Sequence, residues 1–227
     1  LYEDGVFPTP DGKARFVTVD HAPTAEQTDA ATPISLLSGR LRDHWHGMSR
    51  TGTVPRLFNL DDEPQLAMHP CDMRHRGLRS GDLVRVSNAR GELAVRVIER
   101  PGLKKGRAWM PMHWGSQFMN SPGVNAVACA AVDPHSRQPE LKHAAVQITR
   151  LDLPYPVTVI RRCADQAAAR RLLQAVRPLL ANFPYATVGL YGRQSALVLL
   201  RAASALPLDD TAIDALDGLF GIDGQAG

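Results

Sequence analysis

The residues best suited to chemistry stand in one block, Ser38-Gly39-Arg40 through Trp45-His46-Gly47. An arginine presents a planar fork of donors that matches phosphates and cyclic carbonyl groups. A tryptophan offers a ring for stacking, and a glycine at a strand end lets the backbone approach a ligand closely. These residue types favour a ligand-binding loop. They also fit a plain loop whose tryptophan is buried in the core and whose charged side chains are solvated.

Two later blocks place polar residues on expected loops. Met110-Pro111-Met112-His113-Trp114 is followed by Val124-Asn125 and then by the run from Asp133 to His143, which contains Gln138-Pro139-Glu140-Leu141-Lys142. Asparagine, glutamine and lysine side chains can donate to a purine edge and to phosphates. Each of them, taken alone, is more often an ordinary surface residue.

Composition excludes several classes of function. The 227 residues carry 26 basic and 23 acidic side chains, a net charge of +3, which is too balanced to predict a nucleic-acid or anionic-membrane partner. No apolar run approaches the roughly 20 residues that span a bilayer. Cys71, Cys129 and Cys163 lie far apart, so we expect no zinc site or iron–sulfur cluster held by this chain alone. They favour free thiols in a reducing compartment.

Short alternating segments predict a mainly β fold for the first two thirds of the chain. Strands are expected at five places, separated by turns: 34–37, 83–86, 93–97, 108–112 and 144–148. A short helix is expected to start near His69-Pro70-Cys71-Asp72 and to stop at Gly77. Gly81 and Asp82 then read as a turn, so this unit is interpreted as scaffold. Many short strands with little helix argue for a closed or nearly closed β-barrel.

Three segments are expected along the chain. Residues 1–31 are an irregular leading segment that enters from a preceding domain, with a turn at Asp11-Gly12 and a short strand after it. The barrel occupies 32–150, and 151–227 form a small α+β module, with 151–156 as its linker. In that module we expect strands at 157–160, 186–191 and 196–200 and helices at 164–180 and 209–219. Both ends of the sequence look like cuts through a longer polypeptide.

In their order along the chain, these blocks resemble a known domain. Ser-Gly-Arg-x-x-Asp-x-Trp-His is followed by His-Pro-x-Asp, Gly-Asp-Leu-Val-Arg-Val, Pro-Met-His-Trp, Val-Asn and Asp-Pro-x-Ser-x-Gln-Pro-Glu-x-Lys. This order resembles the C-terminal molybdopterin-dinucleotide-binding domain of the dimethyl sulfoxide reductase superfamily. Trp-His, Met-His-Trp and Gln-Pro-Glu-Leu-Lys look most like bacterial assimilatory nitrate reductases. The resemblance covers roughly residues 1–150, including Phe-Pro-Thr-Pro-Asp-Gly near the start.

The resemblance implies a double-psi β-barrel that binds bis(molybdopterin guanine dinucleotide) with molybdenum, within a cytoplasmic enzyme of nitrate assimilation that reduces nitrate to nitrite. It implies that twelve residues line the cofactor: Ser38, Gly39, Arg40, Leu41, Arg42, Asp43, His44, Trp45, His46, Gly47, Asn125 and Lys142. His113 falls where periplasmic relatives have a phenylalanine near the substrate funnel. Two departures matter: Gly47 replaces a threonine that the family often has, and the stretch after Asn125 favours the assimilatory branch.

The family's metal ligand and iron–sulfur cysteines lie upstream of this domain. We therefore expect no catalytic residue and no metal ligand in this chain, and no nitrate reduction by this chain alone. The expected partners are the remainder of the enzyme polypeptide and an electron donor protein or reductase, without nucleic acid or membrane. The module at 157–227 is assigned no chemistry, and Asp165, Arg170 and Arg193 are expected to be solvated.

Two alternatives stay open. The barrel could belong to a formate dehydrogenase or another molybdenum oxidoreductase, because the cofactor is common to all of them and substrate choice is set mostly upstream. It could instead be a cofactor-free interaction module. The grouping of Arg40, Trp45 and His46 at an expected strand end argues against the second alternative, since a plain scaffold barrel needs no such group.

Overall fold

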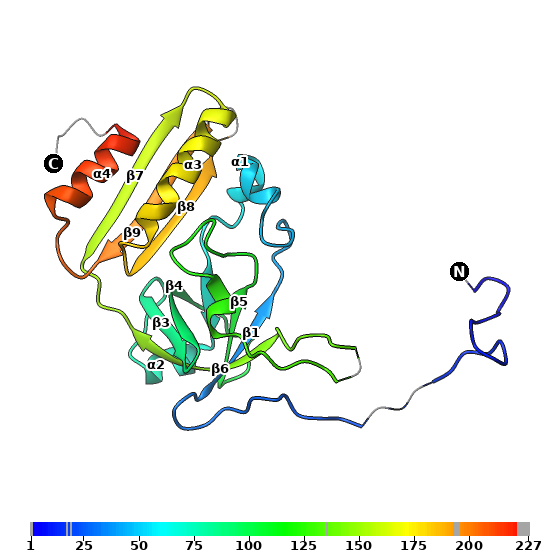
Figure 1. Ribbon diagram of the computed structural model, residues 1–227. Helices are drawn as coiled ribbons and strands as arrows, with labels where there is room; N and C mark the ends of the chain where they lie inside the picture. Colours follow the sequence, from blue (N-terminus) through cyan, green and yellow to red (C-terminus); the bar gives the residue numbers. More distant parts are fainter. Residues whose placement is uncertain (1, 17, 19, 135, 193–195, 222–227) are drawn as a thin grey trace.

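The computed structural model describes residues 2–16, 18, 20–134, 136–192 and 196–221 (Figure 1). It contains a closed six-stranded barrel and a separate three-stranded sheet with helices beside it. This arrangement confirms the mainly β prediction of a barrel followed by a small α+β module. Among the described residues, no helix combines the length and the apolarity that crossing a membrane requires.

The barrel strands follow the order β1-β5-β2-β4-β3-β6, and β6 pairs with β1 to close the ring. Two pairs are parallel, β1 with β5 and β2 with β4, and the others are antiparallel. The five expected strands appear: four are longer than expected, β5 is shifted by one residue, and β2 is added. The strands are β1 Ile34–Gly39, β2 Gln65–Met68, β3 Leu83–Asn88, β4 Gly91–Glu99, β5 Arg107–Pro111 and β6 His143–Arg150.

The barrel core follows from alternation along the strands. Val84 and Val86 of β3 are fully buried, as are Val95 and Val97 of β4, and Arg85 between the two β3 valines is exposed. Successive side chains of a strand point to opposite faces, so alternate apolar residues fill the inside of the barrel. The sequence does not predict β2, because its four residues show no such alternation: Leu66, Ala67 and Met68 are all buried.

Four short helical segments connect the strands: η1 Thr51–Thr53, α1 Pro55–Phe58, α2 Pro70–His75 and η2 Gly123–Val127. The ring of His69 caps α2 by accepting the Cys71 N–H at 3.1 Å. Asp72 is buried and accepts the Gly106 N–H at 2.7 Å, and Asp82 accepts the Arg79 N–H at 2.9 Å. These carboxylates hold turns, as expected of scaffold.

The second sheet is antiparallel, in the order β7-β9-β8. Its elements are β7 Tyr155–Cys163, α3 Gln166–Leu180, β8 Tyr185–Tyr191, β9 Ala196–Ser204 and α4 Asp210–Phe220. Figure 1 shows α3 lying along this sheet and α4 beside β7. The expected linker 151–156 was too long, because Tyr155 and Pro156 already pair with β9. Arg193 lies outside the described residues.

This sheet packs directly against one end of the barrel through β8 and β9. The Tyr185 hydroxyl donates to the Glu63 carboxylate, and Arg201 pairs with Asp62 at 2.9 Å. Burial raises the pKa of Glu63. Gly189 of β8 faces Phe58 so closely that a Cβ atom there would lie 2.0 Å from the ring. The barrel and the sheet therefore share one continuous core.

The start of the chain corrects one prediction. A turn forms at residues 9–12, with the Gly12 N–H donating to the Thr9 carbonyl at 3.0 Å. Residues 13–16, however, form no strand, and Phe16 is 98% exposed. Figure 1 shows the start of the chain extending away from the barrel, so that no strand lies beside it for pairing. A single strand without a partner has no ladder to stabilise it.

Asp165 is a helix cap rather than a freely solvated residue, because its carboxylate accepts the Ala168 N–H at 2.7 Å where α3 begins. Arg170, also expected to be solvated, is exposed but donates to the Thr53 carbonyl at 3.5 Å.

We predict that Asp165→Ala lowers the free energy of unfolding by about 1 kcal/mol. Urea unfolding of the full chain measures this, with Asp214→Ala on the exposed side of α4 as the control. Equal stability of the two variants would rule out the cap.

Candidate functional site

Several of the predicted site residues lie at the end of the barrel where β1 and β5 finish. These two strands are parallel, so the segments that follow them, from Arg40 and from Met112, leave at the same edge. β6 is antiparallel to β1, which brings its preceding residue Lys142 to that edge as well. The Ser38 hydroxyl donates to the Leu141 carbonyl at 2.6 Å, and the Ser38 N–H donates to the Lys142 carbonyl at 3.4 Å. Three separate blocks of the sequence thus meet.

A small hollow of about 90 Å³ opens at this edge, lined by Arg40, Trp45, His46, Met112 and His113. The Arg40 guanidinium lies 4.6 Å from the centroid of the half-exposed Trp45 ring. The Lys142 ammonium lies 3.3 Å from the Met112 sulfur. None of the five lining residues is acidic. The lining therefore combines the Arg40 cation with an aromatic ring, and the Lys142 cation lies next to it at Met112, which suits an anionic heterocyclic ligand.

His113 is buried under the hollow, with only 2% of its surface exposed. Its Nε2 accepts the Leu41 N–H at 3.0 Å, so the proton of the neutral ring must be on Nδ1, which donates to the His46 carbonyl. Burial lowers the pKa of His113 and outweighs the hydrogen bond to the His46 carbonyl, which raises it, and the nearby Arg40 and Lys142 cations lower it further. His113 therefore has a definite structural role, because its neutral imidazole joins both ends of the segment 41–46.

His44 also points inward. It is 1% exposed, and its ring nitrogens lie 3.2 Å from the Thr51 hydroxyl and 3.3 Å from the Asp61 carbonyl. The segment is therefore supported from inside by two histidines, whose rings are 5.9 Å apart. Arg42 and Asp43 pair with each other at 3.1 Å, and the Arg42 side chain is 86% exposed, outside the lining of the hollow.

The backbone of this segment is unusual. His46 and Met48 both have positive φ, 47° and 58°, which is uncommon for residues other than glycine. Met48 is fully buried and holds the bend in place. Gly39 was predicted to admit a ligand, but a Cβ there would lie 2.5 Å from the Trp109 indole nitrogen. The neighbouring Trp109 side chain therefore also favours a glycine at this position.

Asn125 lies in η2 and is exposed. Within the described part of the chain, no hydrogen bond joins its side chain to the five residues of the hollow. Its segment is nevertheless next to them, because Gly123, at the start of η2, lies against the carbonyl of Trp114, the residue after His113.

Sequence reasoning missed Met112 as a site residue. Its position directly before His113 in the Met-His-Trp block was the available signal.

A buried donor without an acceptor lies directly behind the site. It is the indole N–H of Trp114, which has no hydrogen-bond partner in the described structure. Trp114 follows His113 and packs against Phe58, with ring centroids 5.4 Å apart. Among the described residues, no three His, Cys, Asp or Glu side chains are grouped so that they could hold a metal ion.

This chain is similar in sequence and in structure to several known proteins. Residues 34–145 match the family described as the molybdopterin dinucleotide binding domain. A protein named nitrate reductase from Klebsiella oxytoca is 44% identical over 138 residues, which are 61% of this chain and 16% of that relative. Among solved structures, acetylene hydratase from Pelobacter acetylenicus matches with a TM-score of 0.42 and 17% identity, over 53% of this chain and 18% of that one.

Over residues 34–145, the barrel of this chain therefore matches the molybdopterin dinucleotide-binding domain family. The donor set fits such a ligand, because a dinucleotide carries an anionic pyrophosphate and flat, acceptor-rich rings. Arg40 can donate two parallel N–H groups, and Lys142 adds a second positive charge without a carboxylate in the hollow. A hollow of about 90 Å³ accommodates only part of a dinucleotide. Further contacts must come from outside it.

The buried His113 predicts a pH dependence. Its folded-state pKa is below the ordinary value of 6.5, so the unfolded chain takes up the proton first as pH falls. The stability that neutral His113 contributes is complete above about pH 6.5 and is lost progressively below it. We expect the melting temperature of the full-length protein to fall between about pH 7 and pH 5, and less steeply in His113→Gln. Parallel curves for the two proteins would refute this role.

Proposed function

We propose that this chain is the C-terminal part of a molybdenum oxidoreductase that reduces nitrate to nitrite, and that its barrel holds bis(molybdopterin guanine dinucleotide). The observation that carries the proposal is the coincidence of the family match over 34–145 with a cationic, aromatic hollow at one end of the same barrel. The 44% identity to a protein named nitrate reductase supports nitrate as the substrate.

When bound, the molybdenum centre would supply the two-electron exchange with the substrate. The residues of this chain would bind and orient the dinucleotide. Arg40 would donate its fork of N–H groups to a phosphate or pterin carbonyl, and Lys142 would balance the pyrophosphate charge. Trp45 would keep the Arg40 guanidinium over its ring, and His113 would keep the segment 41–46 in shape.

The chain spans 16% of the length of the nitrate reductase that it matches. The metal ligand, an iron–sulfur cluster and the contact with an electron donor protein or reductase are therefore proposed to lie in the rest of the polypeptide. The proposal includes a cytoplasmic enzyme of nitrate assimilation. The three cysteines, which are unpaired thiols, are compatible with a reducing compartment.

The proposal is tested on the full-length protein, purified from a host that makes the cofactor and supplied with a reduced artificial electron donor. We expect nitrite to form from nitrate, and we expect no nitrite from the 227-residue chain alone with cofactor added. Nitrate reduction by this chain alone would contradict the proposal. Formate oxidation without nitrate reduction by the full-length protein would assign the domain to another molybdenum oxidoreductase.

A further inference from the structure

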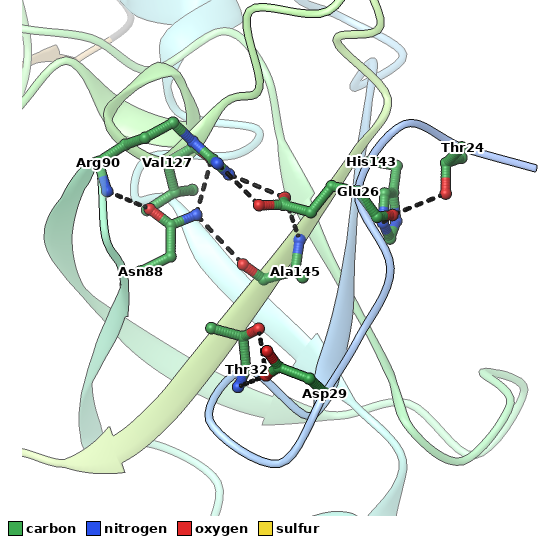
Figure 2. Close-up of polar contacts among 9 residues, drawn as sticks. All are labelled: Thr24, Glu26, Asp29, Thr32, Asn88, Arg90, Val127, His143 and Ala145. Atoms are coloured by element: carbon green, nitrogen blue, oxygen red, sulfur yellow. Dashed lines mark hydrogen bonds and ion pairs between the residues drawn. The ribbon is translucent and has the colours of Figure 1, made fainter.

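A second polar cluster lies beside the site, where β6 starts and β3 turns into β4 (Figure 2). Its centre is the ion pair of Glu26, in the leading segment, with Arg90, in the β3–β4 turn. The two oxygens of Glu26 lie 2.7 and 2.8 Å from two guanidinium nitrogens of Arg90. The Arg90 side chain is 33% exposed and the Glu26 side chain 22%. A bidentate, partly buried pair of this kind fixes orientation as well as distance.

Arg90 also holds the segment that carries Asn125. It donates to the Val127 carbonyl, at the end of η2, from Nη2 at 2.8 Å and from Nε at 3.2 Å. Asn88 donates to the same carbonyl at 3.0 Å and to the Ala145 carbonyl at 3.1 Å. A Cβ at Gly91 would lie 2.8 Å from the Ala126 carbonyl, so this turn packs closely on η2.

Glu26 holds the segment that carries Lys142. Its Oε2 accepts the Ala145 N–H at 2.8 Å, and its backbone carbonyl lies 2.9 Å from Nε2 of His143. Since a carbonyl only accepts, Nε2 carries a proton, and Nδ1 lies 3.0 Å from the Ser35 hydroxyl. Lys142 is thus next to His143, whose ring contacts both Ser35 of β1 and the Glu26 carbonyl. Figure 2 shows His143 and Glu26 close together.

We propose that Glu26 and Arg90 are positioning residues for the cofactor. Their ion pair fixes the positions of Asn125 and Lys142 relative to each other, so the leading segment is part of the site. This inference rests on the proposed function. It also gives Glu26 a role that the sequence did not suggest, because residues 1–31 were interpreted only as an irregular leading segment. An anchor that merely ties down the leading segment would not need contacts to both η2 and β6.

The test uses the full-length protein and the rate at which molybdenum and guanine nucleotide are lost after dilution. Arg90→Ala and Glu26→Ala should each release the cofactor about tenfold faster, as is usual when a support of a ligand-binding residue is removed. The matched control is Arg85→Ala, which breaks an exposed pair of 3.4 Å with Glu92 on the same hairpin. It should release cofactor at the wild-type rate.

A positioning role is separated from a merely structural one by combining variants. In the Asn125→Ala/Lys142→Ala background, Glu26→Ala should accelerate release by less than about threefold, because the contacts it sets are already lost. A full tenfold effect in that background would overturn the inference. Glu26→Gln keeps an acceptor for the Ala145 N–H without the charge. It provides a milder variant, for which we expect an intermediate rate, if Glu26→Ala folds poorly.

The outcomes also separate this inference from the proposed function. Wild-type release by Arg90→Ala, together with fast release by Asn125→Ala/Lys142→Ala, would overturn only the positioning role. Wild-type release by Asn125→Ala/Lys142→Ala would overturn the assigned cofactor contacts and the inference with them.

Discussion

Replacing Lys142 by alanine in the full-length protein is expected to weaken retention of the dinucleotide roughly tenfold or more. A hydrogen bond to a charged group contributes about 1.5–3 kcal/mol, and about 1.4 kcal/mol corresponds to a factor of ten. The Lys142 ammonium lies at the hollow, 3.3 Å from the Met112 sulfur. Molybdenum and guanine nucleotide remaining after dilution measure the effect.

The matched control is Lys105→Ala. Lys105 is an exposed lysine in the turn before β5, at the opposite end of the strand that leads to the hollow. It should keep the cofactor as the wild type does. Equal retention by the Lys105 and Lys142 variants would show that Lys142 is a surface residue.

Arg40 should behave in a related but distinguishable way. Arg40→Ala is expected to lower bound molybdenum and guanine nucleotide together, whereas Arg40→Lys restores part of the retention, because an ammonium keeps the charge but not the planar fork. The stacking of Arg40 on Trp45 at 4.6 Å also depends on that fork. Unchanged cofactor content in purified Arg40→Ala would contradict the assignment.

The second large effect is expected at Gly123. Its φ is +64°, and a Cβ there would lie 1.9 Å from the Trp114 carbonyl oxygen, a backbone atom that cannot turn aside. Gly123→Ala should therefore destabilise the protein by about 2–4 kcal/mol, from the left-handed backbone and the steric overlap together. Thermal unfolding of the full chain measures this.

Gly218 provides a control, because its replacement by alanine should change the stability in the opposite direction. It lies in α4, its φ is not positive, and a Cβ there would meet nothing within 4 Å. Gly218→Ala should make the protein more stable by up to about 1 kcal/mol, since alanine is the better helix former. A Gly123→Ala variant as stable as the wild type would show that the site does not depend on the fit of η2 against Trp114.

Local patterns were enough to predict most of the barrel strands. The alternation at 83–86 and 93–97 and the turn between them appear as β3 and β4. β2 escaped prediction, because its buried run shows no period of two and its partners, β4 and β5, come later in the chain. Pairing between distant segments is not encoded in any short window.

The sequence predicted which segments form the candidate site, but not which of their residues are exposed, buried or structural. Residue types marked the segment 38–47, yet nothing in them distinguished the exposed Trp45 from the buried His44. The role of His113 depends on contacts across 67 and 72 positions of the sequence, and that of the Glu26–Arg90 pair on a contact across 64 positions. Only the closed barrel brings those residues together.

The most direct test of the central claim is the molybdenum and guanine nucleotide content of the purified full-length protein. A barrel that holds bis(molybdopterin guanine dinucleotide) predicts two guanine nucleotides for each molybdenum in the wild type and a parallel loss of both in Arg40→Ala and Lys142→Ala. A well-folded wild-type protein, made in a host that supplies the cofactor, that contains neither would contradict it.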